Sequence, residues 1–278
     1  PAASRTILGT TDTDYHGDPD RVAADAADID YLLEVANFFF PESKLVPDDV
    51  LATWAGLRPL VMPSSDGLDA SSVSREHRIL SRPGLVTIIG GKLTTYRRMA
   101  AQLLSEAYKQ LGVTEPPCAT LDRPLPGATD WKPPTDDFDP VAELTEELVA
   151  LNLPGIDRQV ARHLATTYGV RARTIVEKIQ QGGDPSASDR LDPELPFLYA
   201  EVDLAVTVDL AVRLDDVLSR RMPLLLLARD QGLGCADKVA ERIAKLRNWS
   251  KERTELELRH YRDVVALSRQ FRSVPSGK

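Results

Sequence analysis

Prolines recur over residues 114–140 more densely than elsewhere in the chain, at positions 116, 117, 124, 126, 133, 134 and 140. Proline lacks a backbone N–H and its ring clashes with the preceding helical turn, so neither a helix nor a central strand can run through such a segment. Strand-like runs and helices precede this segment, whereas only helical spacing follows it. The sequence therefore predicts a mixed α/β part over 1–113, a proline-rich linker or arm over 114–140, and an all-α domain over 141–278.

The mixed part is expected to contain a β-hairpin followed by a long helix. The Pro83-Gly84 pair separates two strand-like runs, 72–80 and 85–89, which is the pattern of a hairpin with a tight turn. Apolar residues at helical spacing then predict a helix from residue 94 or 95 to residue 111. Two further elements are expected upstream, a strand over 5–10 and a helix over 28–37.

The all-α domain is expected to hold seven helices. Apolar residues recur there with the spacing of amphipathic helices, and residues 182–189 have the composition of a loop. The predicted helices cover residues 140–152, 157–168, 171–180, 194–203, 207–218, 235–249 and 251–271.

Composition narrows the class of protein. Hydrophobic residues make up 42% of the chain and charged residues 27%, which is typical of soluble globular proteins. The net charge of −8 leaves no basic footprint, so we expect no nucleic-acid partner. The two cysteines, Cys118 and Cys235, lie too far apart in sequence for a disulfide framework or a metal site, and a reducing cytoplasmic setting is expected with no bound metal.

A glycine pair and a lysine, Gly90-Gly91-Lys92, stand between the second strand-like run and the long helix. Glycine lets the backbone approach a ligand closely, and the first N–H groups of a helix have no partner inside it. The positive end of the helix dipole attracts negative charge, and the lysine adds a full charge. This pattern predicts a site for a phosphate, a carboxylate or the anionic edge of a reduced flavin. The alternative is an ordinary turn beside a solvated lysine.

Two common nucleotide-binding motifs do not occur here. A P-loop would need a glycine at position 86 and a serine or threonine at position 93, which are Val86 and Leu93. The dinucleotide fingerprint Gly-x-Gly-x-x-Gly occurs nowhere in the sequence.

Arginines mark two other candidate binding positions. Arg58 lies inside the apolar run 54–59, and its planar guanidinium matches a carboxylate or phosphate, although a structural salt bridge is the open alternative. Farther along, alternation places Arg75 and His77 on one face of a strand and Arg78 on the other. Such residues taken alone commonly form a solvated edge.

Four stretches together resemble the FAD-dependent glycerol-3-phosphate dehydrogenases of the glucose-oxidase-like flavoprotein superfamily. They are Gly9-Thr-Thr-Asp12 with Gly17-Asp-Pro19, Trp54-Ala-Gly-Leu-Arg-Pro-Leu60, Ser74-Arg-Glu-His77 and Gly90-Gly-Lys-Leu-Thr-Thr-Tyr-Arg97. The resemblance covers about residues 4–110, and Asp215–Arg221 is similar to a segment of the family's C-terminal domain.

The resemblance implies an α+β fold that forms the C-terminal part of a two-domain FAD-dependent oxidoreductase and ends in an all-α domain. Strand and hairpin segments of the flavin and substrate domain, with one long helix, would come first. The family's N-terminal FAD domain carries a glycine-rich fingerprint that this sequence lacks. We therefore expect the chain to begin inside a larger protein and to be inactive alone.

The same resemblance implies roles for individual residues. Arg58 and Arg75 would bind and orient the substrate with its phosphate, while Lys92 would lie near both substrate and flavin; Lys92 and Arg58 are thus the catalytic candidates. No catalytic base is assigned, although His77 is expected nearby. The cofactor-binding residues are expected to be Gly90, Gly91, Lys92, Leu93, Thr94 and Thr95.

The implied reaction is the oxidation of sn-glycerol 3-phosphate to dihydroxyacetone phosphate, with hydride transfer from C2 to N5 of FAD. Electrons would then pass to a membrane quinone. We accordingly expect a cytoplasmic homodimer at the periphery of the cytoplasmic membrane.

Two other functions stay open at this point. The first is an amino-acid or sarcosine oxidase-type flavoenzyme, in which Arg58 would bind a carboxylate. The second is a non-catalytic helical interaction module, because half of the chain consists of predicted helices without distinctive motifs.

Overall fold

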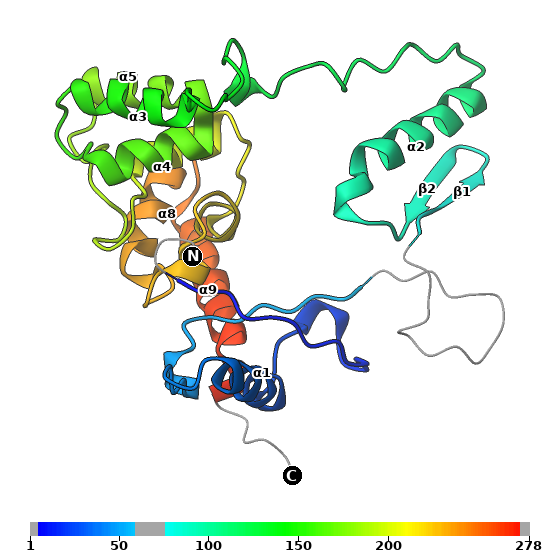
Figure 1. The fold of residues 1–278 in the computed structure, drawn as a ribbon, viewed down its shortest axis with the longest axis horizontal. Helices are drawn as coiled ribbons and strands as arrows, with labels where there is room; N and C mark the ends of the chain where they lie inside the picture. The colour runs from blue at the N-terminus through cyan, green and yellow to red at the C-terminus, as the bar shows by residue number, and fades with distance from the viewer. Residues whose placement is uncertain (1–4, 59–75, 273–278) are drawn as a thin grey trace. The chain divides into compact units, whose positions relative to one another are not determined.

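The computed structural model describes residues 5–58 and 76–272 of the chain (Figure 1). These residues form two compact units. The hairpin unit contains the described residues of 12–22 and 56–124, and the helical unit contains those of 1–11, 23–55 and 125–278.

The hairpin unit is built from two strands and one helix. Strand β1 (Arg78–Arg82) pairs antiparallel with β2 (Leu85–Ile89), so that the predicted hairpin is confirmed. A single 3-10 turn, η4 (Leu93–Thr95), leads into helix α2 (Tyr96–Leu111), which packs beside β2 (Figure 1).

A glutamine on α2 connects the helix to the hairpin turn. Gln110 Nε2 donates to Ser81 Oγ at 2.6 Å and to the carbonyl oxygen of Arg82 at 2.9 Å. Its Oε1 accepts the N–H of Gly84 at 3.1 Å. One side chain thus satisfies three polar groups at the end of a two-stranded ribbon, which is only marginally stable by itself.

Within the described chain, α2 buries none of its residues. Large apolar side chains of the hairpin unit are exposed as well, including Leu85 (58%), Leu104 (54%) and Leu111 (72%). The hairpin unit is therefore held by local pairing and hydrogen bonds rather than by a core.

The helical unit contains most of the chain's regular structure. A π-helical segment, η7 (Asp216–Arg221), interrupts the run of α-helices. Short 3-10 turns are η1 (Pro19–Arg21, in the hairpin unit), η2 (Pro47–Asp49), η5 (Pro126–Ala128), η6 (Gly169–Arg171) and η8 (Gln270–Arg272). The α-helices are α1 (Ala26–Phe39), α3 (Pro140–Ala150), α4 (Arg158–Tyr168), α5 (Ala172–Gln180), α6 (Tyr199–Thr207), α7 (Leu224–Leu227), α8 (Leu233–Arg247) and α9 (Lys251–Ser268).

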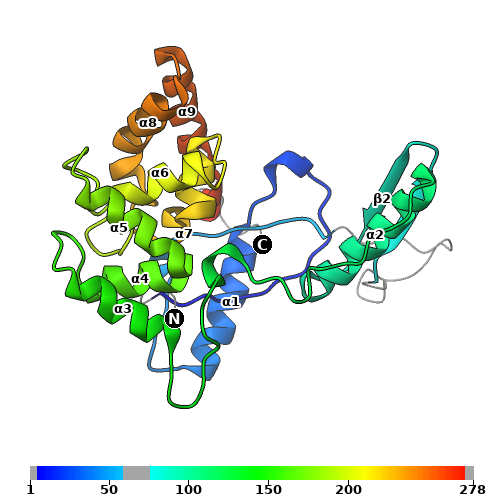
Figure 2. The same ribbon diagram turned by 90° about the horizontal axis from the view of Figure 1, so that it is seen from above.

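Helix α6 separates two apolar cores and lies between α5 and α8 (Figure 2). Ala200 and Leu204 pack into the core built with α3, α4 and α5. Val202 and Val206 pack into the core built with α8 and α9. A third, small cluster joins α1 to Phe271 after α9. The helix periodicity that predicted an all-α domain therefore arises from these buried stripes.

Three predicted elements are wrong. The helix predicted over 194–203 begins only at Tyr199, because Pro196 interrupts it. Residues 6–10 form no strand, and the side chain of the preceding Arg5 donates to Glu194 at 2.8 Å and to the carbonyl oxygen of Leu227 at 3.1 Å.

The third error is the helix predicted over 207–218. Residues 208–213 are not helical, since the Asp216 carboxylate accepts the N–H groups of Val212 and Arg213 at 2.9 Å each. The side chain thus competes with the helical ladder. The predicted domain limits at residues 113 and 140 stay a prediction, because a compact unit of one chain need not coincide with a domain.

The proline-rich arm contacts the helical unit at a pair of glycines. A Cβ at Gly169, whose φ is +57°, would lie 2.0 Å from the carbonyl oxygen of Gly127 in η5. The turn at the end of α4 therefore requires a residue without a side chain.

We predict that Gly169→Ala lowers the free energy of unfolding by roughly 2–4 kcal/mol, through left-handed strain and overpacking. Gly183→Ala is the matched control, because a Cβ there meets no atom within 4 Å and the backbone φ is not positive. Urea unfolding of the two variants checks this, and equal midpoints would contradict the close approach.

Candidate functional site

The turn after β2 has a backbone conformation that favours glycine twice in succession. Gly90 has a φ of +75° and Gly91 a φ of +93°. Side chains rarely adopt this region, so the Gly-Gly pair is required by the change of direction between β2 and η4.

The segment that follows begins with backbone donors. The N–H and the side-chain Oγ1 of Thr95 both donate to the carbonyl oxygen of Lys92 at 3.0 Å, which closes the turn. The N–H groups of Leu93 and Thr94 precede this first internal bond, so they are the unpaired donors of the turn. Lys92 is exposed, and Leu93 is 88% exposed. The arrangement can bind a negatively charged planar group with backbone donors and one ammonium.

His77 lies against α2, on the inner side of this turn. Its Nε2 is 2.6 Å from Gln102 Oε1, and the side chain is half-buried. This pairing gives the imidazole a structural partner on α2.

Arg58 forms an ion pair with Asp12 at 2.5 Å inside the hairpin unit. The arginine side chain is 39% exposed and the aspartate 57% exposed. Within the described residues, no hydrogen bond or ion pair joins Arg58 to the segment 90–95. Arg75 lies outside the described residues. The geometry therefore brings the predicted cofactor-binding residues together in one turn and leaves both arginine roles as predictions.

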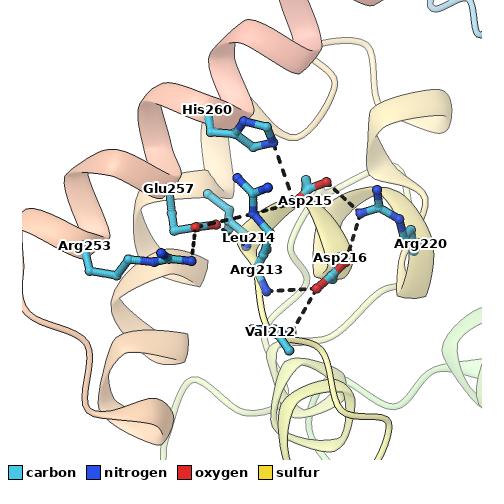
Figure 3. A network of polar contacts seen from close by, with 9 residues as sticks. All are labelled: Val212, Arg213, Leu214, Asp215, Asp216, Arg220, Arg253, Glu257 and His260. Atoms are coloured by element: carbon cyan, nitrogen blue, oxygen red, sulfur yellow. Dashed lines mark hydrogen bonds and ion pairs between the residues drawn. The ribbon is translucent and has the colours of Figure 1, made fainter. Parts of the chain in front are cut away.

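A second polar cluster lies in the helical unit, between η7 and α9 (Figure 3). Glu257 on α9 is fully buried, accepts the N–H of Leu214 at 3.0 Å and pairs with Arg253 at 2.6 Å. Arg213 Nε lies 3.5 Å from Glu257 and 3.6 Å from Asp215. The cluster thus fixes the non-helical segment before η7 to α9.

Arg220 of η7 neutralises the two adjacent aspartates of this cluster. Arg220 Nη1 donates to Asp215 at 2.6 Å and to Asp216 at 3.0 Å, and the Asp215 carboxylate raises the pKa of Arg220. Burial acts to raise the pKa of Asp216, but the N–H groups of Val212 and Arg213 outweigh it and hold that pKa below its ordinary value. Arg220 and Asp216 therefore both stay charged at neutral pH.

Sequence reasoning missed Glu257 as the centre of this cluster. The only signal in the sequence was the Arg253 and Glu257 spacing, which fits an ordinary helical ion pair on a surface. Nothing local indicated that the carboxylate would also reach the backbone of Leu214.

Two further findings bear on the class of protein. Across residues 5–58 and 76–272, no three His, Cys, Asp or Glu side chains gather in a way that could hold a metal ion. In the same part of the chain, no helix is both long and apolar enough to cross a membrane.

Comparison with known proteins identifies the class. Residues 1–97 match the family model of FAD dependent oxidoreductases, and residues 118–254 match that of the C-terminal domain of alpha-glycerophosphate oxidase. A solved glycerol-3-phosphate dehydrogenase from Bacillus halodurans, complexed with FAD, is similar with a TM-score of 0.74 and 26% identity. The match covers 97% of this chain and 50% of the chain of that solved structure.

Sequence relatives agree with this result. The glycerol-3-phosphate dehydrogenase of Synechocystis is 33% identical over 95% of this chain and 46% of its own length. Glycerol-3-phosphate dehydrogenase 2 of Mycobacterium tuberculosis is 34% identical over 94% of this chain and 42% of its own length. The mitochondrial enzyme of Mesocricetus auratus is 33% identical over 93% of this chain and 34% of its own length.

The fold and the two matched segments thus correspond to part of a FAD-dependent oxidoreductase. Within that class, the chain is similar to glycerol-3-phosphate dehydrogenases over more than nine tenths of its length, which confirms the resemblance and the fold class predicted from the sequence. The chain spans less than half the length of the three sequence relatives and half that of the solved structure.

We predict that Glu257→Gln lowers the free energy of unfolding by about 2 kcal/mol, because it removes the charged acceptor of Arg253 and one of the two carboxylates beside Arg213. Glu255→Gln changes an exposed carboxylate on the same helix and is the control. Thermal unfolding of both variants provides the measurement. A similar, small change in both would show that the buried cluster does not stabilise the helical unit.

Proposed function

We propose that this chain supplies the helical C-terminal domain and part of the flavin and substrate domain of an enzyme that oxidises sn-glycerol 3-phosphate to dihydroxyacetone phosphate with FAD. The observation that carries the proposal is the Gly90-Gly91-Lys92 turn before the start of a helix, inside the segment that matches the FAD-dependent oxidoreductase model.

The residues of this turn fit the pyrimidine edge of a flavin. Its donors are the N–H groups of Leu93 and Thr94 and the exposed ammonium of Lys92. The flanking side chains Leu93 and Tyr96 are exposed by 88% and 64% and could contact a flat ring system.

FAD, when bound, supplies the hydride acceptor. The chain's own donors then act electrostatically. Backbone N–H groups fixed by the Thr95 bonds, together with Lys92, would stabilise the negative charge that accumulates as the cofactor is reduced. Because these groups are fixed before the reaction, they lower the energy of the charged product without reorganisation.

Arg58 is the proposed ligand of the substrate phosphate, together with Arg75. Its partner Asp12 is more than half exposed, and a surface ion pair of this kind contributes only about 0.2–1 kcal/mol. A dianionic phosphate can therefore replace Asp12 as the partner of the guanidinium at little cost. Binding of the phosphate away from the reacting carbon would then position C2 for hydride transfer.

We also propose that electrons pass to a membrane quinone and that the protein is a homodimer at the periphery of the cytoplasmic membrane. The family resemblance supports this assignment. The chain alone, without the remaining half of the family's length, is proposed to be inactive.

The test is anaerobic bleaching of the bound flavin in the FAD-loaded full-length protein. Glycerol 3-phosphate is expected to bleach the flavin, whereas sarcosine and amino acids are expected to leave it oxidised. If only sarcosine or amino acids bleached the flavin, the protein would instead be assigned to the amino-acid and sarcosine oxidase class. Absence of any flavin binding would refute the proposal.

We predict that Lys92→Met lowers kcat roughly 10- to 100-fold, because one charge-assisted interaction of about 1.5–3 kcal/mol is lost. Lys109→Met removes an exposed lysine from the same unit and should leave kcat unchanged. Steady-state kinetics with an artificial electron acceptor distinguishes the two variants. Equal turnover in both would remove Lys92 from the mechanism.

We predict that Arg58→Ala raises KM and lowers kcat for glycerol 3-phosphate, with a combined loss in kcat/KM of roughly 10- to 100-fold. Asp12→Asn removes the other half of the ion pair and should leave KM unchanged or lower it, since it frees the guanidinium. If both variants had the same effect, the pair would be structural and Arg58 would not bind substrate.

A further inference from the structure

We infer that Met99 is a positioning residue that sets the conformation of the Gly91-Lys92 turn and, through it, the direction of the donors offered to the flavin. The part of this inference that concerns the flavin depends on the function proposed above. The part that concerns the turn depends only on contacts within the hairpin unit.

The thioether of Met99 occupies the space beside the α-carbon of Gly91. A Cβ at Gly91 would lie 2.3 Å from Met99 Cε and 2.4 Å from Met99 Sδ. Met99 therefore packs directly on the backbone of the turn. Glycine is therefore favoured at position 91 for two reasons, the close contact with Met99 and the positive φ.

A hydroxyl connects the same sulfur to the next residue of the turn. Thr95 Oγ1 lies 3.0 Å from the carbonyl oxygen of Lys92 and 3.4 Å from Met99 Sδ. The hydroxyl has one proton, which it donates to the carbonyl, the stronger acceptor, while the polarisable sulfur lies against its other side. Met99 thus limits the rotation of the side chain that closes the turn.

His77 also approaches the α-carbon of Gly91. Its Cβ would be 3.3 Å from a Cβ at Gly91, and its ring pairs with Gln102, one turn of α2 beyond Met99. The side chains of His77 and Met99 therefore both occupy the space beside Gly91, and both are half-buried although α2 buries no residue.

This placement separates a positioning role from a role in general stability. Met99 is not part of a core, so its truncation removes little buried apolar surface. What the truncation removes is the contact that restricts the Gly91 backbone. Leucine has a similar volume, and such exchanges are commonly tolerated. Met99→Leu should therefore retain the turn, and Met99→Ala should loosen it.

The first measurement is hydrogen exchange of the backbone N–H of Thr95, which donates to the carbonyl oxygen of Lys92, in the full-length protein. Met99→Ala is expected to exchange several-fold faster there, while Met99→Leu stays within about twofold of the unsubstituted protein. Leu104→Ala is the matched control, because it truncates a 54% exposed leucine on the same helix. Equal acceleration in Met99→Ala and Leu104→Ala would overturn the inference, since it would indicate general loosening of the helix.

The second measurement is the midpoint potential of bound FAD in the same variants. Met99→Ala is expected to lower the equilibrium constant for flavin reduction about tenfold, which is about 30 mV for a two-electron couple. kcat should fall while KM for glycerol 3-phosphate changes little. Faster exchange with an unchanged potential would overturn the link between the turn and the flavin. Failure of the unsubstituted protein to bind FAD would instead refute the proposed function, while the exchange result would still decide the role of Met99 in the turn.

Discussion

The buried carboxylate of Glu201 organises the helical unit. It lies at the start of α6, is fully buried, and accepts hydrogen bonds from His163 Nε2 at 2.8 Å, the Tyr168 hydroxyl at 2.7 Å and the N–H of Leu198 at 2.7 Å. Three donors from α4 and from the chain before α6 satisfy a group whose burial alone would be costly. Burial and the nearby carboxylate raise the pKa of Tyr168, so its hydroxyl remains a donor. The interaction fixes α6 against α4, and both cores of the unit then pack on the two sides of α6.

The hairpin unit follows a different principle. It has no such buried anchor in its described residues, and its helix buries no side chain. Its order comes from the β1 and β2 pairing, from the three hydrogen bonds of Gln110 and from the contacts of Met99 and His77 around Gly91. Stability and function are thus separated in this chain: the helical unit has the cores, and the hairpin unit has the proposed flavin turn.

The difference between the two units also decides which parts of the fold could be predicted from the sequence. The hairpin, α2 and most helices were predictable because turn dipeptides and apolar spacing are local signals. The error at residues 194–203 came from ignoring Pro196 within an apolar stretch. The error at residues 207–218 came from a side chain, Asp216, that bonds the backbone in place of the helical ladder.

In the candidate site, too, contacts between neighbours in sequence could be predicted, whereas contacts between distant segments could not. The Gly90-Gly91-Lys92 turn follows from backbone rules and was placed correctly between β2 and α2. The partner of Arg58 could not be predicted, because Asp12 is 46 residues away in sequence and exposed acidic residues are numerous. The role of Glu257 could not be predicted for a similar reason, since its contact with Leu214 spans 43 residues.

Met99 falls between these two cases. It lies only eight residues from Gly91, yet its contact depends on the rotamer that directs a long, flexible side chain back toward the start of α2. All the contacts that define the turn lie between His77 and Gln102. Because the turn is defined by so short a stretch, its geometry does not require the cores of the helical unit. This explains in physical terms why the turn could be predicted from a short string of residues, while the ion pair of Arg58, whose partner lies in another segment, could not.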